Sequence, residues 1–206
     1  MSQILMAGGG RPGFDPVTLV HMFAFRHQVF HDRLGWDVTS DHGLEYDHFD
    51  RLDPVYLLAR DENARVEGCW RILPTTGPYM LRDTFPQLLG GMPAPHSLDV
   101  WELSRFAVDP GDGERGQARL NQVALDLMRR AFDFAVEHHI HQYVTVTSVA
   151  LERLMKAGGV PMTRLGDGRA QRIGKVLTVA CRIAVDEPLR QALYPVQPTA
   201  MARHAA

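Results

Sequence analysis

The sequence predicts an α/β domain of the α+β type, in which helices cover one twisted, mostly antiparallel sheet in three layers. Two observations indicate this class. Two long segments carry apolar residues at the spacing of amphipathic helices, and several shorter segments have the alternating or continuously apolar pattern of strands. Their order is helix, antiparallel strands, central helix, strand, helix and strand, which differs from the regular alternation of a parallel sheet.

The N-terminal half is predicted to hold one helix and three strands. The helix begins at Asp15-Pro16, because a carboxylate at the cap and a proline at the first helical position favour a helix start. The strands are residues 54–59, 65–73 and 100–108, and a segment rich in Pro and Gly, residues 74–99, precedes the third strand.

Side chains in the predicted strand 100–108 should alternate between the two faces of the sheet. Strict alternation places Trp101, Leu103 and Arg105 on one face and Glu102, Ser104 and Phe106 on the other. Charged residues within an apolar strand are costly unless they are paired, so Arg71, Glu102 and Arg105 are candidates for a functional site. A structural ion-pair network is the alternative explanation for each of them.

The C-terminal half is predicted to begin with a polar, glycine-rich turn, residues 109–116, and a strongly amphipathic helix after it. A strand at residues 142–147, a short helix at 149–156 and a late strand at 175–184 follow. A last short helix begins near Asp186.

The length and composition favour a single cytoplasmic domain. We expect one domain over residues 1–206, with a core at about 15–194 and a frayed tail after Tyr194. The net charge of −2 argues against nucleic-acid binding, and no apolar run is long enough for a membrane-spanning helix. The N-terminus lacks the pattern of a secretory signal, and two distant cysteines do not suggest a disulfide framework. We predict no metal site.

The segment of residues 26–50 carries a dense polar pattern. It holds six carboxylates together with Trp36, between two apolar segments. Acidic side chains and an indole suit a small cation, because an indole face attracts a desolvated cation by roughly 0.5–2 kcal/mol. An acidic surface loop with one anchoring Trp is the alternative. Arg26 lies on the apolar face of the first helix, so it needs an acidic partner unless its charged end reaches solvent.

At these polar positions taken together, the chain resembles the acyl-homoserine lactone synthases, the autoinducer synthases of bacterial quorum sensing. The resemblance covers about residues 19 to 183. It rests on Arg26, Val29, Phe30, Gly35, Trp36, Asp47, Asp50, Arg71, residues 72–76, Pro78, Tyr79, Phe85, residues 102–106 and residues 144–153. It implies a GCN5-type N-acetyltransferase-like fold. It also implies an enzyme that joins S-adenosyl-L-methionine, as a substrate and not a cofactor, to an acyl group on acyl carrier protein. The implied products are an N-acyl-L-homoserine lactone, methylthioadenosine and the free carrier.

The resemblance also implies roles for the site residues. Glu102 is the expected general base for the methionyl amine, Asp47 is the second choice, and Arg71 would lock the acidic network or contact the substrate. The expected S-adenosyl-L-methionine-binding residues are Arg26, Phe30, Trp36, Asp47, Asp50, Arg105 and Phe106. The tetrahedral oxyanion should accept hydrogen bonds from backbone N–H groups of residues 104–107, where a splayed sheet would leave them unpaired.

The acyl chain is expected in a channel between the sheet and a helix, although each lining candidate could equally be ordinary core. The candidates are Met80, Leu103, Ser104, Val123, Leu127, Val144, Thr145, Val146, Thr147 and Leu154. In the family that the chain resembles, a threonine at this strand is associated with a 3-oxo group. The preference of β-branched residues for strands is the alternative explanation. We expect a 3-oxo or 3-hydroxy chain of medium length.

A set of basic residues is expected to dock the acidic carrier, although scattered solvated cations are the alternative. The set is Arg153, Lys156, Arg164, Arg169, Arg172 and Lys175. The competing function is a generic GCN5-like N-acyltransferase that uses an acyl-CoA. Such enzymes cradle the pyrophosphate on a turn before the central helix. The matching segment here, residues 113–118, lacks the expected first Arg or Gln.

Overall fold

The computed structural model describes residues 2–111 and 113–195, without the side chains of residues 113–121. Most of the tail that the sequence predicts to be frayed therefore lies outside the described residues. Among the described residues, eight strands form one sheet in the order β1-β4-β5-β6-β7-β10-β8, and β9 also pairs with β10. All neighbours are antiparallel except β6 and β7, which are parallel. This confirms the predicted mostly antiparallel sheet.

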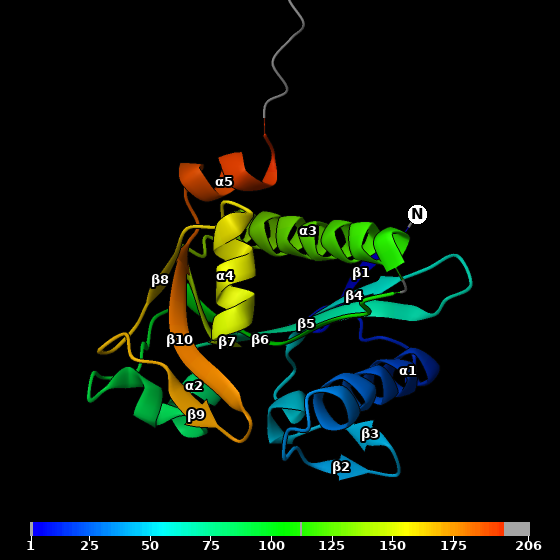
Figure 1. Ribbon diagram of the computed structural model, residues 1–206, viewed down its shortest axis with the longest axis horizontal. Coiled ribbons are helices and arrows are strands. Elements are labelled where there is room, and N and C mark those ends of the chain that lie inside the picture. The colour runs from blue at the N-terminus through cyan, green and yellow to red at the C-terminus, as the bar shows by residue number, and fades with distance from the viewer. Residues whose placement is uncertain (1, 112, 196–206) are drawn as a thin grey trace, which may run out of the picture.

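Helices separate groups of one to three strands along the chain (Figure 1). The strands of the sheet are β1 (Gln3–Ala7), β4 (Val55–Arg60), β5 (Val66–Pro74), β6 (Val100–Val108), β7 (Gln142–Ser148), β8 (Met162–Arg164), β9 (Gln171–Ile173) and β10 (Val176–Ala184). A separate hairpin consists of β2 (Ser40–Asp41) and β3 (Leu44–Glu45). The longer helices are α1 (Pro16–His27), α3 (Gly113–Glu137), α4 (Val149–Ala157) and α5 (Glu187–Leu193). The short ones are the π-helix η1 (Gln28–Arg33), the 3₁₀ helices η2 (His48–Arg51) and η3 (Pro86–Leu89), and α2 (Met80–Asp83).

Helices lie on both faces of the sheet, which gives the three predicted layers. Figure 1 shows α3 and α5 on one side, and α1 with the β2–β3 hairpin on the other. The largest apolar core lies beneath α3, where Leu127 and Phe134 are buried against the sheet. A second core lies beneath α1, around Met22 and Phe30. Each helix buries one apolar face, as amphipathic helices on a sheet do.

Five short strands, β1, β2, β3, β8 and β9, and the start of α3 differ from the sequence prediction. The strand β1 was not predicted, and it extends the sheet before the expected core start at residue 15 by pairing antiparallel with β4. It is a short edge strand, so its five residues carry little periodic signal. The helix α3 begins at Gly113, within the segment predicted as a turn. Glycine is a poor helix former, which is why the sequence alone favours a turn there.

The alternation predicted for β6 is wrong from Arg105 onward. Cys69 pairs with Ala107 but Arg71 pairs with Ser104, so Trp70 faces two residues of β6 instead of one. This extra residue is a β-bulge, and Arg105 adopts a φ of 59° there. The bulge places Arg105 on the same side of the sheet as Ser104, and Phe106 on the α3 side against Trp70.

The strands β6 and β7 separate midway along their length. Their parallel pairing runs from Val100 with Gln142 to Leu103 with Thr145, while β6 continues to Val108 and β7 to Ser148. The bulge at Arg105 follows directly after the last pair. The sheet therefore opens beside residues 104–107, as the sequence predicts.

Candidate active site

Three buried arginines and three acids form one ion-pair cluster between α1 and the sheet. The first arginine is Arg26, which α1 buries in its last turn. Its Nε donates to Glu45 Oε2 at 2.5 Å, and its two terminal nitrogens donate to Asp50 at 2.8 and 3.0 Å. This forked geometry is the strongest pairing that a guanidinium makes with a carboxylate. Arg26 is therefore paired inside the protein and does not reach solvent.

The second and third arginines come from neighbouring strands. Arg71 on β5 donates to Asp47 at 2.6 and 3.1 Å, to Asp50 at 2.8 Å and to the hydroxyl of Ser104 at 3.1 Å. Arg105 on β6 donates to Glu45 at 3.0 Å and to Asp47 at 2.9 Å. The bulge makes the contacts of Arg105 with Glu45 and Asp47 possible, because strict alternation would turn Arg105 to the other face of the sheet.

The sequence analysis missed two members of this cluster, Glu45 and Tyr56. Glu45 is fully buried between Arg26 and Arg105 and was counted only as one of six acids in its segment. The hydroxyl of Tyr56 donates to Asp50 at 2.6 Å. A charge count gave no signal for Glu45, since Asp47, Asp50 and Glu102 already matched the three arginines in number, and only the structure shows that Glu102 accepts backbone N–H groups instead.

The cluster stays charged despite its burial. Burial would raise the pKa of Asp50, but Arg26 and Arg71 outweigh it and lower that pKa. Burial likewise disfavours the charged form of Arg26, and the carboxylates of Asp50 and Glu45 raise its pKa. With three charges of each sign, the cluster is a rigid, formally neutral support. Asp47 is its most exposed acid, with a side chain 12% exposed, and Arg105 its most exposed arginine at 8%.

Glu102 lies beside the cluster, at the point where β6 and β7 separate. Its side chain is fully buried, and its two oxygens accept the backbone N–H groups of Met80 and Leu81 at 2.9 and 2.7 Å. Burial raises the pKa of Glu102 to about 7, against the lowering effect of these two hydrogen bonds. Met80 also bridges to the cluster, because Arg105 donates to its sulfur at 3.1 Å. A pKa near 7 lies in the range that suits a general base at neutral pH.

An aromatic wall lies beside the cluster, on the α1 side of the sheet. The rings of Phe30 and Trp36 stack with centroids 5.2 Å apart, and the Arg105 guanidinium lies 5.5 Å from the Phe30 ring centre. The Trp36 Nε1 atom is buried without a hydrogen-bond partner among the described residues. Phe106, predicted to share this wall, instead packs edge-on against Trp70 with centroids 4.7 Å apart, on the opposite face. The bulge is the reason for this difference.

The residues predicted to line an acyl channel are divided between different parts of the fold. One group lies on the α3 side of the sheet and consists of Leu103, Val123, Leu127, Thr145 and Thr147. Val144 and Val146 face the opposite side, against Tyr79 and Leu81, while Met80 packs with Phe49 and Ser104 bonds to Arg71. Leu154 is 55% exposed, because α4 buries Glu152 and Met155 instead. Leu154 therefore lines no channel in this structure.

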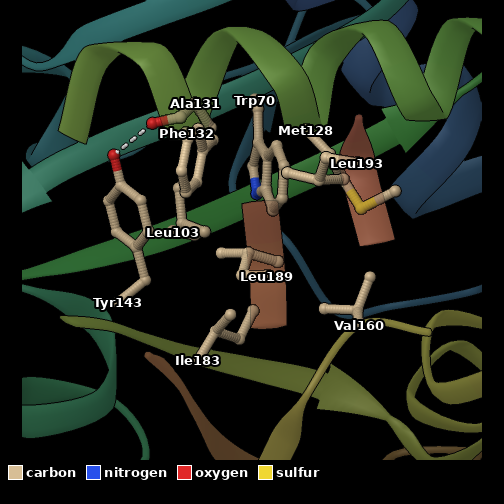
Figure 2. Close-up of a pocket in the computed structure, with 10 residues that line it drawn as sticks. All are labelled: Trp70, Leu103, Met128, Ala131, Phe132, Tyr143, Val160, Ile183, Leu189 and Leu193. Atoms are coloured by element: carbon tan, nitrogen blue, oxygen red, sulfur yellow. Dashed lines mark hydrogen bonds between the residues drawn. The ribbon is translucent and has the colours of Figure 1, made fainter. Parts of the chain in front are cut away.

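A narrow pocket lies on the α3 side of the sheet. It lies between β5, β6, β7 and β10 and the helices α3 and α5, and Figure 2 shows the ten side chains around it. They are Trp70, Leu103, Met128, Ala131, Phe132, Tyr143, Val160, Ile183, Leu189 and Leu193. Of the predicted lining residues, Leu103 is the one found here. The sequence analysis did not single out Trp70, since a Trp in a buried strand reads as ordinary core.

The predicted carrier-docking residues have two different environments. Arg164 and Lys156 both pair with the buried carboxylate of Glu152, at 2.6 and 2.8 Å. The hydrogen bond from Arg164 is the main reason why the pKa of Glu152 falls to about 2. Arg153, Arg169, Arg172 and Lys175 are exposed. The first pair therefore supports the local fold. In the second group, Arg169 pairs with Asp167 at 3.8 Å and Arg172 donates to the carbonyl of Lys175 at 3.2 Å, but all four residues lie at the surface, within reach of a partner.

The described residues contain one group that could hold a metal ion. His27, His31 and Asp32 bring their ligand atoms within 4.8 Å of one another. His31 Nδ1 and Asp32 Oδ1 are already hydrogen-bonded at 2.8 Å, and both residues are exposed. The predicted lack of a metal site stays a prediction. In the part of the chain that the structure describes, no helix is both long and apolar enough to cross a bilayer.

Comparisons with known proteins identify the family of the chain. The family model described as "Autoinducer synthase" matches residues 15–193. The chain belongs to the autoinducer synthase family. Proteins named acyl-homoserine-lactone synthase from Vibrio anguillarum and Pseudomonas aeruginosa are 41% and 42% identical to it. These alignments cover 87% and 90% of this chain and 91% and 92% of the relatives.

Solved structures of the same family share the fold. The acyl-homoserine lactone synthase LasI superimposes with a TM-score of 0.84 at 39% identity, over 94% of this chain and 95% of LasI. TofI, in a complex with an inhibitor and MTA, has a TM-score of 0.79 at 35% identity, over 93% and 96% of the two chains. BjaI, a CoA-dependent synthase with SAM and isopentyl-CoA, has a TM-score of 0.73 at 28% identity, over 86% of this chain and 80% of BjaI. An acyl-CoA N-acyltransferase from Pseudomonas aeruginosa, at 12% identity and a TM-score of 0.58, shares the fold of this chain, which is therefore N-acetyltransferase-like.

Proposed function

We propose that this chain synthesises an N-acyl-L-homoserine lactone from S-adenosyl-L-methionine and an acyl thioester. One observation carries the proposal. A buried carboxylate with a pKa near 7, Glu102, lies beside the arginine–carboxylate cluster and where β6 and β7 separate. The relatives' names support it, since LasI is an acyl-homoserine lactone synthase, and the TofI and BjaI structures hold MTA or SAM.

The amino-acid part of the substrate would bind at the cluster. The methionyl amine would meet Asp47, the most exposed of its acids, and the substrate carboxylate would meet Arg105, the most exposed of its arginines. The sulfonium and the adenosine would lie against Trp36 and Phe30, because an aromatic face attracts a desolvated cation. Arg26, Arg71 and Asp50 hold these groups in place and are positioning residues, since each is already paired within the cluster.

The first chemical step is acylation of the amine. Glu102 accepts a proton from the α-ammonium, and the neutral nitrogen attacks the thioester carbonyl. The C–N bond forms, the C–S bond breaks, and the carrier thiol leaves with a proton. The backbone N–H groups of residues 104–107 would stabilise the oxyanion, and the end of the β6–β7 pairing at Leu103 supports this role.

The second step is ring closure. The methionyl carboxylate attacks its own γ-carbon, a C–O bond forms, and the C–S bond to the sulfonium breaks. Methylthioadenosine leaves as a neutral thioether, so this step needs no proton donor. No cofactor beyond the two substrates takes part in the proposal.

We propose acyl carrier protein as the acyl donor, in the cytoplasm, and acyl-CoA as the alternative donor. Exposed cations at Arg153 and Arg172 suit an acidic carrier. The segment 113–118 lacks the Arg or Gln of a pyrophosphate cradle, although its side chains lie outside the described residues. BjaI is CoA-dependent by its own description, so the CoA alternative is a real competitor.

The test is methylthioadenosine release by the purified protein. S-adenosyl-L-methionine is supplied with octanoyl or 3-oxooctanoyl groups on carrier protein or on CoA, and methylthioadenosine and lactone are measured by mass spectrometry. The proposal expects equal amounts of both products, with carrier protein the better donor. Acylation of an amine without methylthioadenosine release would instead identify a generic N-acyltransferase.

A further inference from the structure

The pocket under α3 contains one polar atom that has no partner. Trp70 is 3% exposed, and its Nε1 atom has no hydrogen-bond partner within the described part of the chain. Figure 2 shows this nitrogen facing the space that the lining side chains surround. The Tyr143 hydroxyl, the other nitrogen- or oxygen-bearing side-chain group among the ten described lining residues, donates to the carbonyl of Ala131 at 2.8 Å.

An unpaired buried donor is expensive. Leaving a buried N–H unsatisfied costs roughly 1–3 kcal/mol, so such groups usually have a partner in the working state of a protein. A water molecule does not suit this position, because a buried water needs two to four polar partners and the lining is otherwise hydrocarbon or already bonded. The lining instead matches hydrocarbon with one acceptor oxygen beside Trp70.

The position of Trp70 says where on the ligand that oxygen belongs. Trp70 lies on β5 opposite the bulge formed by Arg105 and Phe106, and its ring contacts Phe106. The bulge borders the opening between β6 and β7, where the proposed acylation takes place. We therefore expect an oxygen that reaches Trp70 to lie near the thioester end of the acyl chain, with the hydrocarbon beyond it extending toward Leu189 and Leu193.

We propose that Trp70 is a specificity-determining residue that selects 3-substituted acyl chains by donating its indole N–H to the oxygen at C3. This inference rests on the proposed function and names its acyl substrate class, 3-oxoacyl or 3-hydroxyacyl thioesters. The 3-oxo and the 3-hydroxy oxygen can both accept a hydrogen bond from the indole N–H. Thr145 on β7, which pairs with Leu103 on β6, is the competing group for the same oxygen.

The experiment compares acyl donors in full-length variants. The values of kcat/KM are measured for octanoyl, 3-oxooctanoyl and 3-hydroxyoctanoyl carrier protein with wild type, Trp70→Phe and Thr145→Val. A further protein carries 3-benzothienylalanine at position 70, which keeps the bicyclic ring and lacks the N–H. It covers the case in which Trp70→Phe does not fold.

We expect wild type to prefer at least one 3-substituted donor, and both Trp70 replacements to lower that preference by about 5- to 30-fold, as for loss of one buried hydrogen bond. Their kcat/KM for octanoyl carrier protein should change far less, and Thr145→Val should keep the preference. The 3-oxo and 3-hydroxy arms show which oxygen is read.

Two results would overturn the inference. One is an equal loss for substituted and unsubstituted donors when the N–H is removed, which would mean that Trp70 only fills space. The other is a preference that is lost in Thr145→Val and kept in the Trp70 replacements. Failure of wild type to release methylthioadenosine with any donor would instead overturn the proposed function, and this inference with it.

Discussion

Glu45 accepts a hydrogen bond from Arg105, 60 residues further along the chain, at 3.0 Å. Its second oxygen accepts from Arg26 at 2.5 Å, so one fully buried carboxylate joins α1, the β2–β3 hairpin and the strand β6. The contact depends on the bulge at Arg105, whose backbone lies in the left-handed region. A non-glycine residue held there usually indicates that its surroundings compensate the strain.

Removing the Glu45 carboxylate should destabilise the protein. We expect Glu45→Gln to lower the free energy of unfolding by about 3–5 kcal/mol, because it leaves two buried guanidinium groups short of one negative charge. Urea unfolding followed by circular dichroism measures this. The matched control is Glu187→Gln, which breaks an exposed pair with Arg190 and should behave as wild type. Equal stability of the two variants would contradict the structural role of Glu45.

The pH dependence of turnover should identify the general base. Since the pKa of Glu102 is about 7, kcat/KM should rise with pH through that value in wild type. We expect Glu102→Gln to lower kcat by about 10²–10⁴-fold and to abolish this rise. Asp47→Asn is the matched comparison and should keep the rise. If the rise of kcat/KM with pH disappears in Asp47→Asn and persists in Glu102→Gln, the general base is Asp47.

Glu102 should also make stability fall as pH rises. Its pKa is about 7 in the folded protein and 4.5 for an ordinary glutamate, so between these values the folded state binds more protons than the unfolded state. Stability should therefore decline over that range by about 3 kcal/mol from this group. Glu102→Gln should flatten the decline in urea titrations between pH 4.5 and 7. An unchanged slope in the variant would show that Glu102 is not the group that titrates.

Trp36 should affect S-adenosyl-L-methionine more than the acyl donor. We expect Trp36→Ala to raise KM for S-adenosyl-L-methionine by about 3- to 30-fold, because it removes a ring–cation contact of roughly 0.5–2 kcal/mol. The KM for the acyl donor should stay near the wild-type value. Trp101→Phe is the control, since the Trp101 N–H donates to the carbonyl of Leu98, away from the cluster. Equal effects on both substrates would place Trp36 outside the proposed site.

Charge reversal should separate docking residues from structural ones. We expect Arg172→Glu to weaken the reaction with acyl carrier protein by about tenfold at low salt, with little effect at high salt and no change in stability. Arg164→Glu should instead destabilise the contact between α4 and β8, because it places a second carboxylate against buried Glu152. Steady-state kinetics across a salt series and thermal unfolding measure the two effects. A salt-independent response of Arg172→Glu would count against docking through this surface.

The sequence alone determined most of the secondary structure and most members of the polar cluster. Helix caps such as Asp15 and period-two strands are local patterns, so residues close in sequence are enough to predict them. Arg26, Arg71 and Arg105 could be recognised because a charge in an apolar element needs a partner, and Asp47 and Asp50 through the family resemblance. The order of these residues also predicted the autoinducer synthase family.

The tertiary structure alone decided which residues share a face. One extra residue in β6 reverses the side-chain direction from Arg105 onward, and sequence alternation cannot show where a bulge falls. That single insertion brings Arg105 to Glu45 and turns Phe106 toward Trp70. The division of the predicted channel residues between two faces, and the unpaired N–H of Trp70, likewise depend on strand register and helix packing. Those are set by contacts between segments far apart in the chain.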